Sequence, residues 1–301
     1  MSHTHHHENH HHHEVKATSG NAFVIGIILN TSFVLIEVGA GLWNNSLALL
    51  TDAGHNLGDV AGLILVLIAA KLAKRKPTDK FTYGYGKSTI LVALTNAALL
   101  LVAVGAIGWE AIGRISDSHP VPGKIISLVA LVGILINSIT ALLFMKDRKK
   151  DLNVRGAFLH MASDALVSLG VMISGIIIIY TNWYWLDAVI SLVICAVIVW
   201  STWDLLKDSV NLSLDSVPSG VDLKAIREYF LGLKGVSGIH DLHVWALSTN
   251  ASALTAHLVA PEGISDAFLA EINDELHEHF HIDHTTIQVE RSEEANCAQE
   301  C

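Results

Sequence analysis

Charged residues are scarce in this chain. Of its 301 residues, 16% are Asp, Glu, Lys or Arg and 51% are hydrophobic, and the mean hydropathy is +0.45. An ordinary soluble domain of this length is less apolar, so the composition argues against one. The sequence therefore indicates a membrane protein.

Cysteines are also few. Cys195 lies inside an apolar run, and Cys297 and Cys301 lie at the end of the chain. Three cysteines so placed cannot build a disulfide framework. We expect the last two to be cytoplasmic and reduced, so that their thiolates are available as metal ligands.

The first residues of the sequence do not have the pattern expected of a signal peptide. Residues 1–20 are polar and contain eight histidines, so the first apolar run is expected to stay in the protein. With little apolar surface to bury, this segment is predicted to be a disordered cytoplasmic tail that collects divalent metal loosely. A purification tag is the alternative, but Thr4, Glu8 and Asn9 interrupt the histidines and favour a natural segment.

Long apolar runs make up much of the remaining chain. A hydrocarbon core about 30 Å thick requires roughly 20 apolar residues of helix to cross it. Backbone amides cannot stay unpaired in lipid, so these runs are expected to be helices. Buried helices of a soluble protein are the alternative. The six predicted spans cover residues 21–43, 47–73, 89–113, 123–145, 153–181 and 185–207, within a membrane domain of 21–208.

The basic residues predict how the spans are oriented. They gather between the second and third spans and between the fourth and fifth, whereas residues 43–46 and 181–183 contain none. Because Lys and Arg accumulate in cytoplasmic loops, both termini are expected to lie in the cytoplasm. We favour the bacterial inner membrane over an organelle membrane.

A second domain is predicted after the last span. Residues 209–220 have the composition of a linker, and residues 221–291 that of a soluble α+β domain, followed by a tail at 292–301. The periodicity predicts helices at 222–233 and 265–280 and strands at 239–247, 253–260 and 284–291, in the order αββαβ. So small a lobe would gain stability by pairing with a second copy.

Two predicted spans repeat one polar pattern. "HNLGD" at 55–59 and "HMASD" at 160–164 each place a histidine and an aspartate four residues apart, on one face of a helix. An ionised aspartate alone in lipid costs several kcal/mol, so it must be protonated, paired or bound to a cation. Two opposed faces would offer four nitrogen and oxygen ligands to Zn²⁺, with a net charge of zero. The candidate ligands of this shared metal site are His55, Asp59, His160 and Asp164.

Three further acids lie in the spans. Asp52 precedes His55 by one helical turn and is expected either to orient its imidazole or to pack or cap helices. Glu37 and Asp187 have no matching histidine, and we interpret them as interhelical or interfacial hydrogen-bonding groups.

These motifs resemble the cation diffusion facilitator family, and in particular its zinc-exporting branch, the bacterial cobalt-zinc-cadmium resistance and zinc transporter type. The resemblance covers residue 20 to about 291 and is carried by "SLALLTDAGHNLGD" (46–59), "GAFLHMASDALVSLGV" (156–171) and "HDLHVWAL" (240–247). It implies a homodimeric zinc/proton antiporter with one transport site per protomer, at His55, Asp59, His160 and Asp164. It also implies a ferredoxin-like cytoplasmic lobe.

The resemblance implies a second zinc site in that lobe, where zinc acts as a regulatory ion. Family ligand positions match His240, His257 and Glu290, but Gln288 stands where another histidine can occur, which weighs against a binuclear site. The terminal "CAQEC" resembles cysteine pairs that close a second site in some zinc transporters, so Cys297 and Cys301 are candidate ligands; a frayed tail is the alternative. The remaining lobe histidines are expected to be solvated or structural: His243, His277, His279, His281 and His284.

The residues and the resemblance together predict export of zinc by alternating access. Zinc binds only deprotonated ligands, so loading releases protons, and protons from the far side displace the metal. The expected partners are zinc, protons, the lipid bilayer and a second copy of the chain, with no nucleic acid. The alternatives are an intramembrane zinc metalloenzyme, for which the sequence offers no separate general base, and a membrane-anchored zinc sensor.

Overall fold

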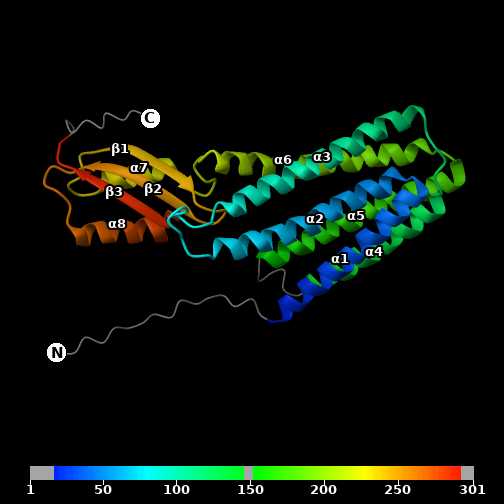
Figure 1. Cartoon of the computed structure of the whole chain (residues 1–301), viewed down its shortest axis with the longest axis horizontal. Helices are drawn as coiled ribbons and strands as arrows, with labels where there is room; N and C mark the ends of the chain where they lie inside the picture. Colours follow the sequence, from blue (N-terminus) through cyan, green and yellow to red (C-terminus); the bar gives the residue numbers. More distant parts are fainter. Residues whose placement is uncertain (1–16, 146–151, 293–301) are drawn as a thin grey trace. The chain divides into compact units, whose positions relative to one another are not determined.

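The computed structural model describes residues 17–145 and 152–292 (Figure 1). Most of the predicted histidine-rich tail and the segment with Cys297 and Cys301 therefore lie outside the described residues. The helix α1 (Ala17–Asn44) begins four residues inside the segment predicted to be disordered. No proline separates these residues from the apolar run, so the helix extends back through them.

The other long helices follow the predicted spans closely. They are α2 (Leu47–Ala73), α3 (Ser88–Ser116), α4 (Gly123–Phe144), α5 (Leu152–Thr181) and α6 (Trp185–Ser213). All except α2 contain a segment long and apolar enough to cross a membrane within the part of the chain that was described. That α2 is a sixth span stays a prediction.

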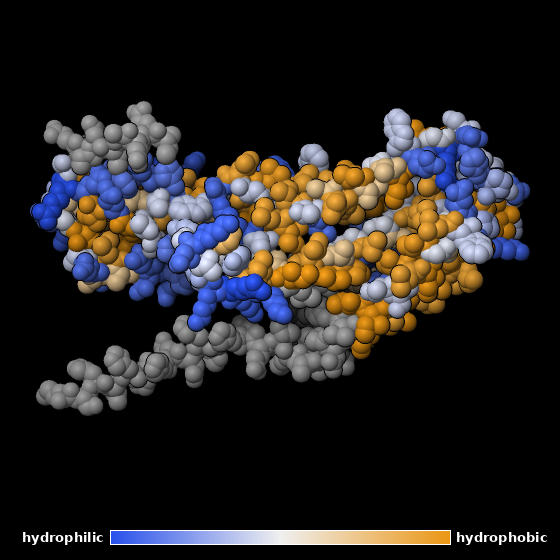
Figure 2. All heavy atoms as spheres, viewed as in Figure 1, coloured by the Kyte–Doolittle hydropathy of each residue, from blue (hydrophilic) through white to orange (hydrophobic). Residues whose placement is uncertain are grey.

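Apolar side chains cover the outside of the long helices (Figure 2). In the five membrane-length segments only 22% to 39% of the residues are buried inside the protein, although the segments are strongly apolar. Val102, Trp109 and Leu166, for example, are 71%, 80% and 68% exposed. Such continuous apolar surface requires lipid rather than water. The protein is therefore an integral membrane protein.

The chain packs as two compact units. The first unit contains α1, the first half of α2, the second half of α3, all of α4 and α5, and the first half of α6; its ranges end at Val60 and run from Ala103 to Ile198. The second unit contains the remaining halves of α2, α3 and α6 and the C-terminal lobe. In the first unit α4 and α5 approach each other at glycines. A Cβ atom on Gly175 would lie 2.5 Å from Ser127 Oγ and 2.9 Å from the Gly123 carbonyl oxygen.

The helix α6 runs five residues into the predicted linker. It ends where Asp215 adopts a left-handed conformation with φ of 59°. The Ser216 N–H then donates to the Asn211 carbonyl at 3.1 Å, and the Asp215 N–H donates to that of Leu212 at 3.4 Å. These two bonds are those of a Schellman motif, which stops a helix after its last turn. The residues before Asp215 contain no helix breaker, so the true end was not apparent from composition.

The lobe has its elements in the predicted order. They are α7 (Leu223–Gly232), β1 (Gly238–Ala246), β2 (Ser252–Val259), α8 (Asp266–Glu278) and β3 (His284–Glu290). The sheet order is β1-β2-β3, with β1 and β2 antiparallel and β2 and β3 parallel. A ferredoxin-like assignment of this small sheet stays a prediction.

One face of the sheet packs on both lobe helices. Ile226 and Phe230 of α7 and Ile272 and Leu276 of α8 share a buried core with alternate strand residues, which are Val244, Leu254, Ala256 and Leu258. Side chains alternate across a strand, so the odd-numbered residues of β2, His257 among them, lie on the other face. That face is where the lobe's candidate ligands gather.

Candidate metal sites

The structure brings the two His-x-x-x-Asp pairs of α2 and α5 together. His55 Nε2 lies 3.6 Å from Asp59 Oδ2 and 3.7 Å from Asp164 Oδ1. His160 Nε2 lies 3.3 Å from Asp59 Oδ2 and 3.6 Å from Asp164 Oδ2. Each histidine thus contacts both carboxylates, and the four side chains form a closed ring, which we call the transport cluster.

The spacing within the transport cluster suits a small dication. A tetrahedral zinc with bonds of about 2.0–2.2 Å keeps its ligand atoms about 3.3–3.6 Å apart. The four histidine–carboxylate separations fall close to this range, at 3.3 to 3.7 Å, and the two histidine rings are 6.1 Å apart. The members of the cluster differ in burial, because the Asp164 side chain is 2% exposed whereas that of His160 is 40% exposed. One side is therefore accessible to an entering ion.

Asp52 does not orient His55 as one sequence interpretation expected. The buried Nδ1 of His55 has no hydrogen-bond partner. Asp52, 1% exposed, instead accepts a hydrogen bond at 3.3 Å from the hydroxyl of Ser168 on α5. The i to i+3 spacing puts Asp52 near His55 on one helix, but the neighbouring helix provides its partner. The alternative of a helix-packing role fits this contact.

Glu37 and Asp187 both join helices. The amide of Asn56 on α2 donates to Glu37 Oε2 on α1 at 3.3 Å. Asp187 of α6 accepts from the Ser46 hydroxyl at 2.6 Å and from the Leu47 N–H at 2.7 Å, and so caps the N-terminus of α2. These contacts fit the interhelical role expected for both acids, and the cap fixes the start of the helix that carries His55 and Asp59.

A second cluster lies on the exposed face of the lobe sheet. His240 of β1 pairs with His257 of β2 in register, and their rings are 5.0 Å apart. Glu290 of β3 reaches both, with Oε2 2.9 Å from His240 Nε2 and Oε1 3.0 Å from His257 Nδ1. Three residues expected to act together are thus adjacent, and we call them, with Asp241, the lobe cluster.

Asp241 was missed by the sequence reasoning. Its Oδ2 lies 3.9 Å from His257 Nδ1, and His240, Asp241 and His257 form a group able to hold a metal ion. In a regular strand Asp241 would face away from His240. The ladder is interrupted between His240 and His243, and Asp241 has a left-handed φ of 48°, so a β-bulge turns its carboxylate to the same side. Aspartate tolerates this conformation better than most residues, which is the only signal that the sequence offered.

Gln288 completes the surroundings of Glu290. Its Nε2 donates to Glu290 Oε1 at 2.9 Å, so the residue that departs from the family pattern orients a candidate ligand. Burial would raise the pKa of Glu290, but the hydrogen bond with His240 and the nearby His257 and Gln288 outweigh it, and its pKa lies below the usual value. Glu290 is therefore favoured as the ionised form that a metal requires. These donors fit a zinc ion.

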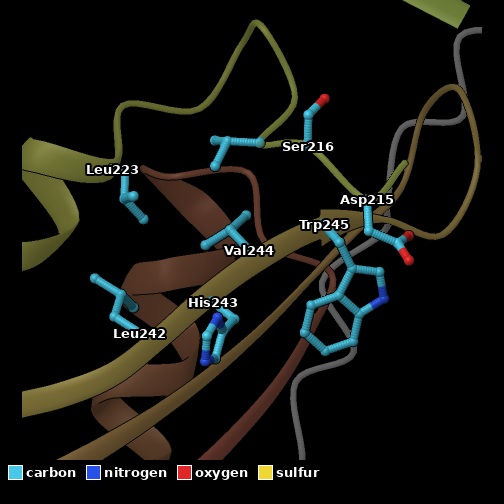
Figure 3. A pocket seen from close by; sticks show the side chains of 8 residues that line it. Asp215, Ser216, Leu223, Leu242, His243, Val244 and Trp245 are labelled. Atoms are coloured by element: carbon cyan, nitrogen blue, oxygen red, sulfur yellow. The ribbon is translucent and has the colours of Figure 1, made fainter. Parts of the chain in front are cut away.

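The other sequence candidates are placed as follows. Cys297 and Cys301 lie outside the described residues, so their part in a site stays a prediction. His279 pairs with Glu275 at 3.2 Å and His284 packs against Tyr83, which suits solvated or structural roles. A pocket between the end of α6 and β1 contains no candidate ligand (Figure 3); it is lined by Asp215, Ser216, Val217, Leu223, Leu242, His243, Val244 and Trp245.

Comparison with known proteins gives full-length matches. The chain is 36% identical to the zinc transporter ZitB of Pectobacterium atrosepticum, over 99% of this chain and 92% of that protein. It is 35% identical to a cadmium, cobalt and zinc/H(+)-K(+) antiporter of Bacillus subtilis, over 96% and 92%. It is 37% identical to the metal cation efflux system protein CzcD of Cupriavidus metallidurans, over 91% and 88%.

Two family descriptions cover nearly all of the described chain. Residues 23–212 match the cation efflux transmembrane domain and residues 218–292 match the cation efflux protein cytoplasmic domain. These matches and the relatives confirm the resemblance found in the sequence motifs. The chain belongs to the cation efflux family, which is also called the cation diffusion facilitator family.

Proposed function

We propose that the protein is a Zn²⁺/H⁺ antiporter that exports zinc from the cytoplasm by alternating access. The observation that carries this proposal is the transport cluster, a ring of two histidines and two aspartates with neighbouring donor atoms 3.3 to 3.7 Å apart. Relatives named as zinc transporters and as a cadmium, cobalt and zinc antiporter support the same substrate class.

The charges of the transport cluster support antiport. Two neutral histidines and two carboxylates neutralise a dication, so the loaded cluster has no net charge in a region of low dielectric. When zinc leaves, the negative charge of Asp59 and Asp164 is uncompensated unless protons replace it. Because metal and protons compete for the same atoms, an inward proton gradient drives zinc outward.

The two alternative functions fit less well. A hydrolytic zinc site needs a water and a general base, and members of this family are transporters rather than enzymes. A sensor would need no ionisable ring between two membrane helices, where such groups are costly.

Zinc flux is the decisive measurement. Full-length protein reconstituted into liposomes should accumulate radiolabelled zinc when an opposing proton gradient is imposed, and should stop when a protonophore is added. As a sensor or as an enzyme it would move no zinc under any gradient. That result would contradict the proposal.

We further propose that the protein is a homodimer in the bacterial inner membrane, with both termini in the cytoplasm and a regulatory zinc site in each lobe. A cytoplasmic domain of the type that residues 218–292 match supports the dimer. His240, His257, Glu290 and Asp241 would hold the regulatory zinc. Cys297 and Cys301 remain candidates for the same site.

A further inference from the structure

Two buried acids lie beside the transport cluster without belonging to it. Glu37 on α1 is 0% exposed and Asp52 on α2 is 1% exposed. Each carboxyl group has one oxygen bound to a neutral donor, the Asn56 amide for Glu37 and the Ser168 hydroxyl for Asp52. The other oxygen of each, Glu37 Oε1 and Asp52 Oδ1, is buried and has no hydrogen-bond partner.

The two carboxyl groups are neighbours, because Asn56, which donates to Glu37, lies one helical turn after Asp52 on the same face of α2. An ionised carboxylate only accepts hydrogen bonds, whereas a protonated one also donates. Two ionised carboxylates side by side in a buried site would repel each other with no solvent to screen them. A single proton on one of them removes the repulsion and supplies the missing donor.

We infer that Glu37 carries a proton, donated in a hydrogen bond to Asp52, while the transport cluster is empty, and that it releases this proton when zinc binds. This inference rests on the proposed function and adds a proton-binding site outside the metal ligands. On release the O–H bond of Glu37 breaks, the proton passes to water and both carboxylates remain ionised.

The surrounding charges connect this proton to the metal. Glu37 is next to Asp52, and Asp52 accepts from Ser168, which lies one helical turn after Asp164 on α5. His55 follows Asp52 by three residues on α2. On α4, which packs against α1, residues 125–144 contain no titratable side chain. While the cluster is empty and its own protons do not neutralise it fully, the negative charges of Asp52 and Asp164 favour the proton on Glu37. A bound dication offsets them, so the proton is held less firmly.

Glu37→Gln is a matched test of this site. The glutamine amide keeps the size of the side chain and can donate to Asp52 in place of the acid, but it cannot release a proton. Glu110→Gln is the control, because Glu110 is 56% exposed on α3 and pairs with Arg114 on its own helix. Neither substitution touches the transport cluster.

The experiment measures protons and zinc in the full-length protein in lipid nanodiscs. Infrared difference spectra should show a protonated carboxyl band lost when zinc binds, present in the wild type and Glu110→Gln and absent in Glu37→Gln. A pH-indicator dye should show about one proton fewer released per zinc in Glu37→Gln, since a carboxyl group holds a single proton. Asp52→Asn, which replaces the charged acceptor by a neutral amide oxygen, should shift the band, and it serves if Glu37→Gln fails to fold.

An unchanged band in both variants, or equal proton release in Glu37→Gln and the wild type, would overturn the inference. Its failure is distinguishable from failure of the proposed function. If the wild type transports zinc but shows no carboxyl band that depends on Glu37, only the proton site is wrong. If the wild type moves no zinc at all, the transport proposal itself is wrong.

Discussion

Asp164 holds the transport cluster together at the level of single residues. It is the most buried member of the ring, and its two oxygens reach both histidines, at 3.7 Å and 3.6 Å. A carboxylate at this depth is stable only with a cation or protons beside it. The ionised Asp164 carboxylate is therefore stabilised by the bound cation, just as the cation is held by the carboxylate.

Asp164→Asn should abolish zinc transport while the protein still folds. The amide keeps the shape of the carboxyl group, but the dication would then keep an uncompensated charge at low dielectric, which costs several kcal/mol. Zinc uptake into liposomes measures this, with far-ultraviolet circular dichroism to check folding. Transport at the wild-type rate would show that Asp164 is not a ligand.

His55→Asp should weaken discrimination among metals. The change replaces a borderline nitrogen ligand by a hard oxygen ligand and adds a negative charge, which favours Mn²⁺ relative to the wild-type preference for zinc. Competition of each metal against radiolabelled zinc uptake gives the order of preference. An order identical to that of the wild type would exclude His55 from the ligand set.

The residues of the transport cluster were predictable because helical periodicity alone places positions i and i+4 on one face. Asp241 was not, because a strand pattern places it on the wrong face and only the bulge reverses it. The partner of Asp52 was equally hidden, since Ser168 lies 116 positions away on another helix. Local periodicity thus identifies ligands on regular elements, whereas irregular backbone and long-range contacts need the fold.

At the scale of elements, the backbones of α4 and α5 approach each other closely at glycines on both helices. Besides the contacts of Gly175, a Cβ on Gly123 would lie 3.1 Å from the Ile179 backbone nitrogen and closer still to the Gly175 carbonyl oxygen. Small residues that allow such close approach drive helix association in lipid. The helix with His160 and Asp164 is therefore fixed to a partner that carries no ligand.

Gly175→Ala should destabilise the protein, whereas Gly170→Ala should not. The methyl group at 175 would overlap Ser127 and the α4 backbone, while at 170 nothing lies within 4 Å. We expect overpacking to cost roughly 1–3 kcal/mol, although part of this is offset by the higher helix propensity of alanine. Thermal unfolding in detergent compares the two variants. Equal unfolding midpoints for the two variants would mean that α4 and α5 accommodate the methyl group at 175 without a loss of stability.

Helix existence and order followed from the apolar runs, but helix ends did not. The end of α6 depends on the left-handed Asp215, and five residues of apparent linker are helical as a result. The helices and strands of the lobe begin and end within two residues of their predicted bounds, and Asp222 and Ser265, the first residues of the two predicted helices, are their N-caps. An N-cap residue marks the start of a helix in the sequence itself. A Schellman motif that has no glycine at its left-handed position leaves no such mark at the end of a helix.

At the scale of the whole molecule, the lobe meets the segment between α2 and α3. Lys87 pairs with Asp215 at 2.6 Å, and the Thr249 N–H donates to Thr89 Oγ1 at 3.0 Å. A Cβ on Gly86 would lie 2.5 Å from the Leu247 carbonyl oxygen, so only glycine permits this approach. The lobe thus contacts the start of α3 directly.

Replacing His240 and His257 together by alanine should reduce zinc transport only partly. In the proposed function the lobe cluster holds a regulatory zinc and the transport cluster carries the ion, so loss of the lobe histidines should leave the path of the ion intact. The full-length variant should also bind zinc with lower total stoichiometry, measured by equilibrium dialysis. Complete loss of transport with unchanged stoichiometry would instead mean that the lobe histidines serve the path itself.

The interlocked glycines of α4 and α5 determine which parts of the carrier are free to move. If α5 moves when access changes, α4 must move with it. The contact that changes is then the one between α5 and α2, where the transport cluster lies and where binding of zinc or protons alters the attraction between the ligands. Spin labels on α4 and α5 should keep one sharp distance through zinc loading and release, whereas a pair on α2 and α5 should alternate between two. The transported ion would then itself determine whether α2 and α5 are held together.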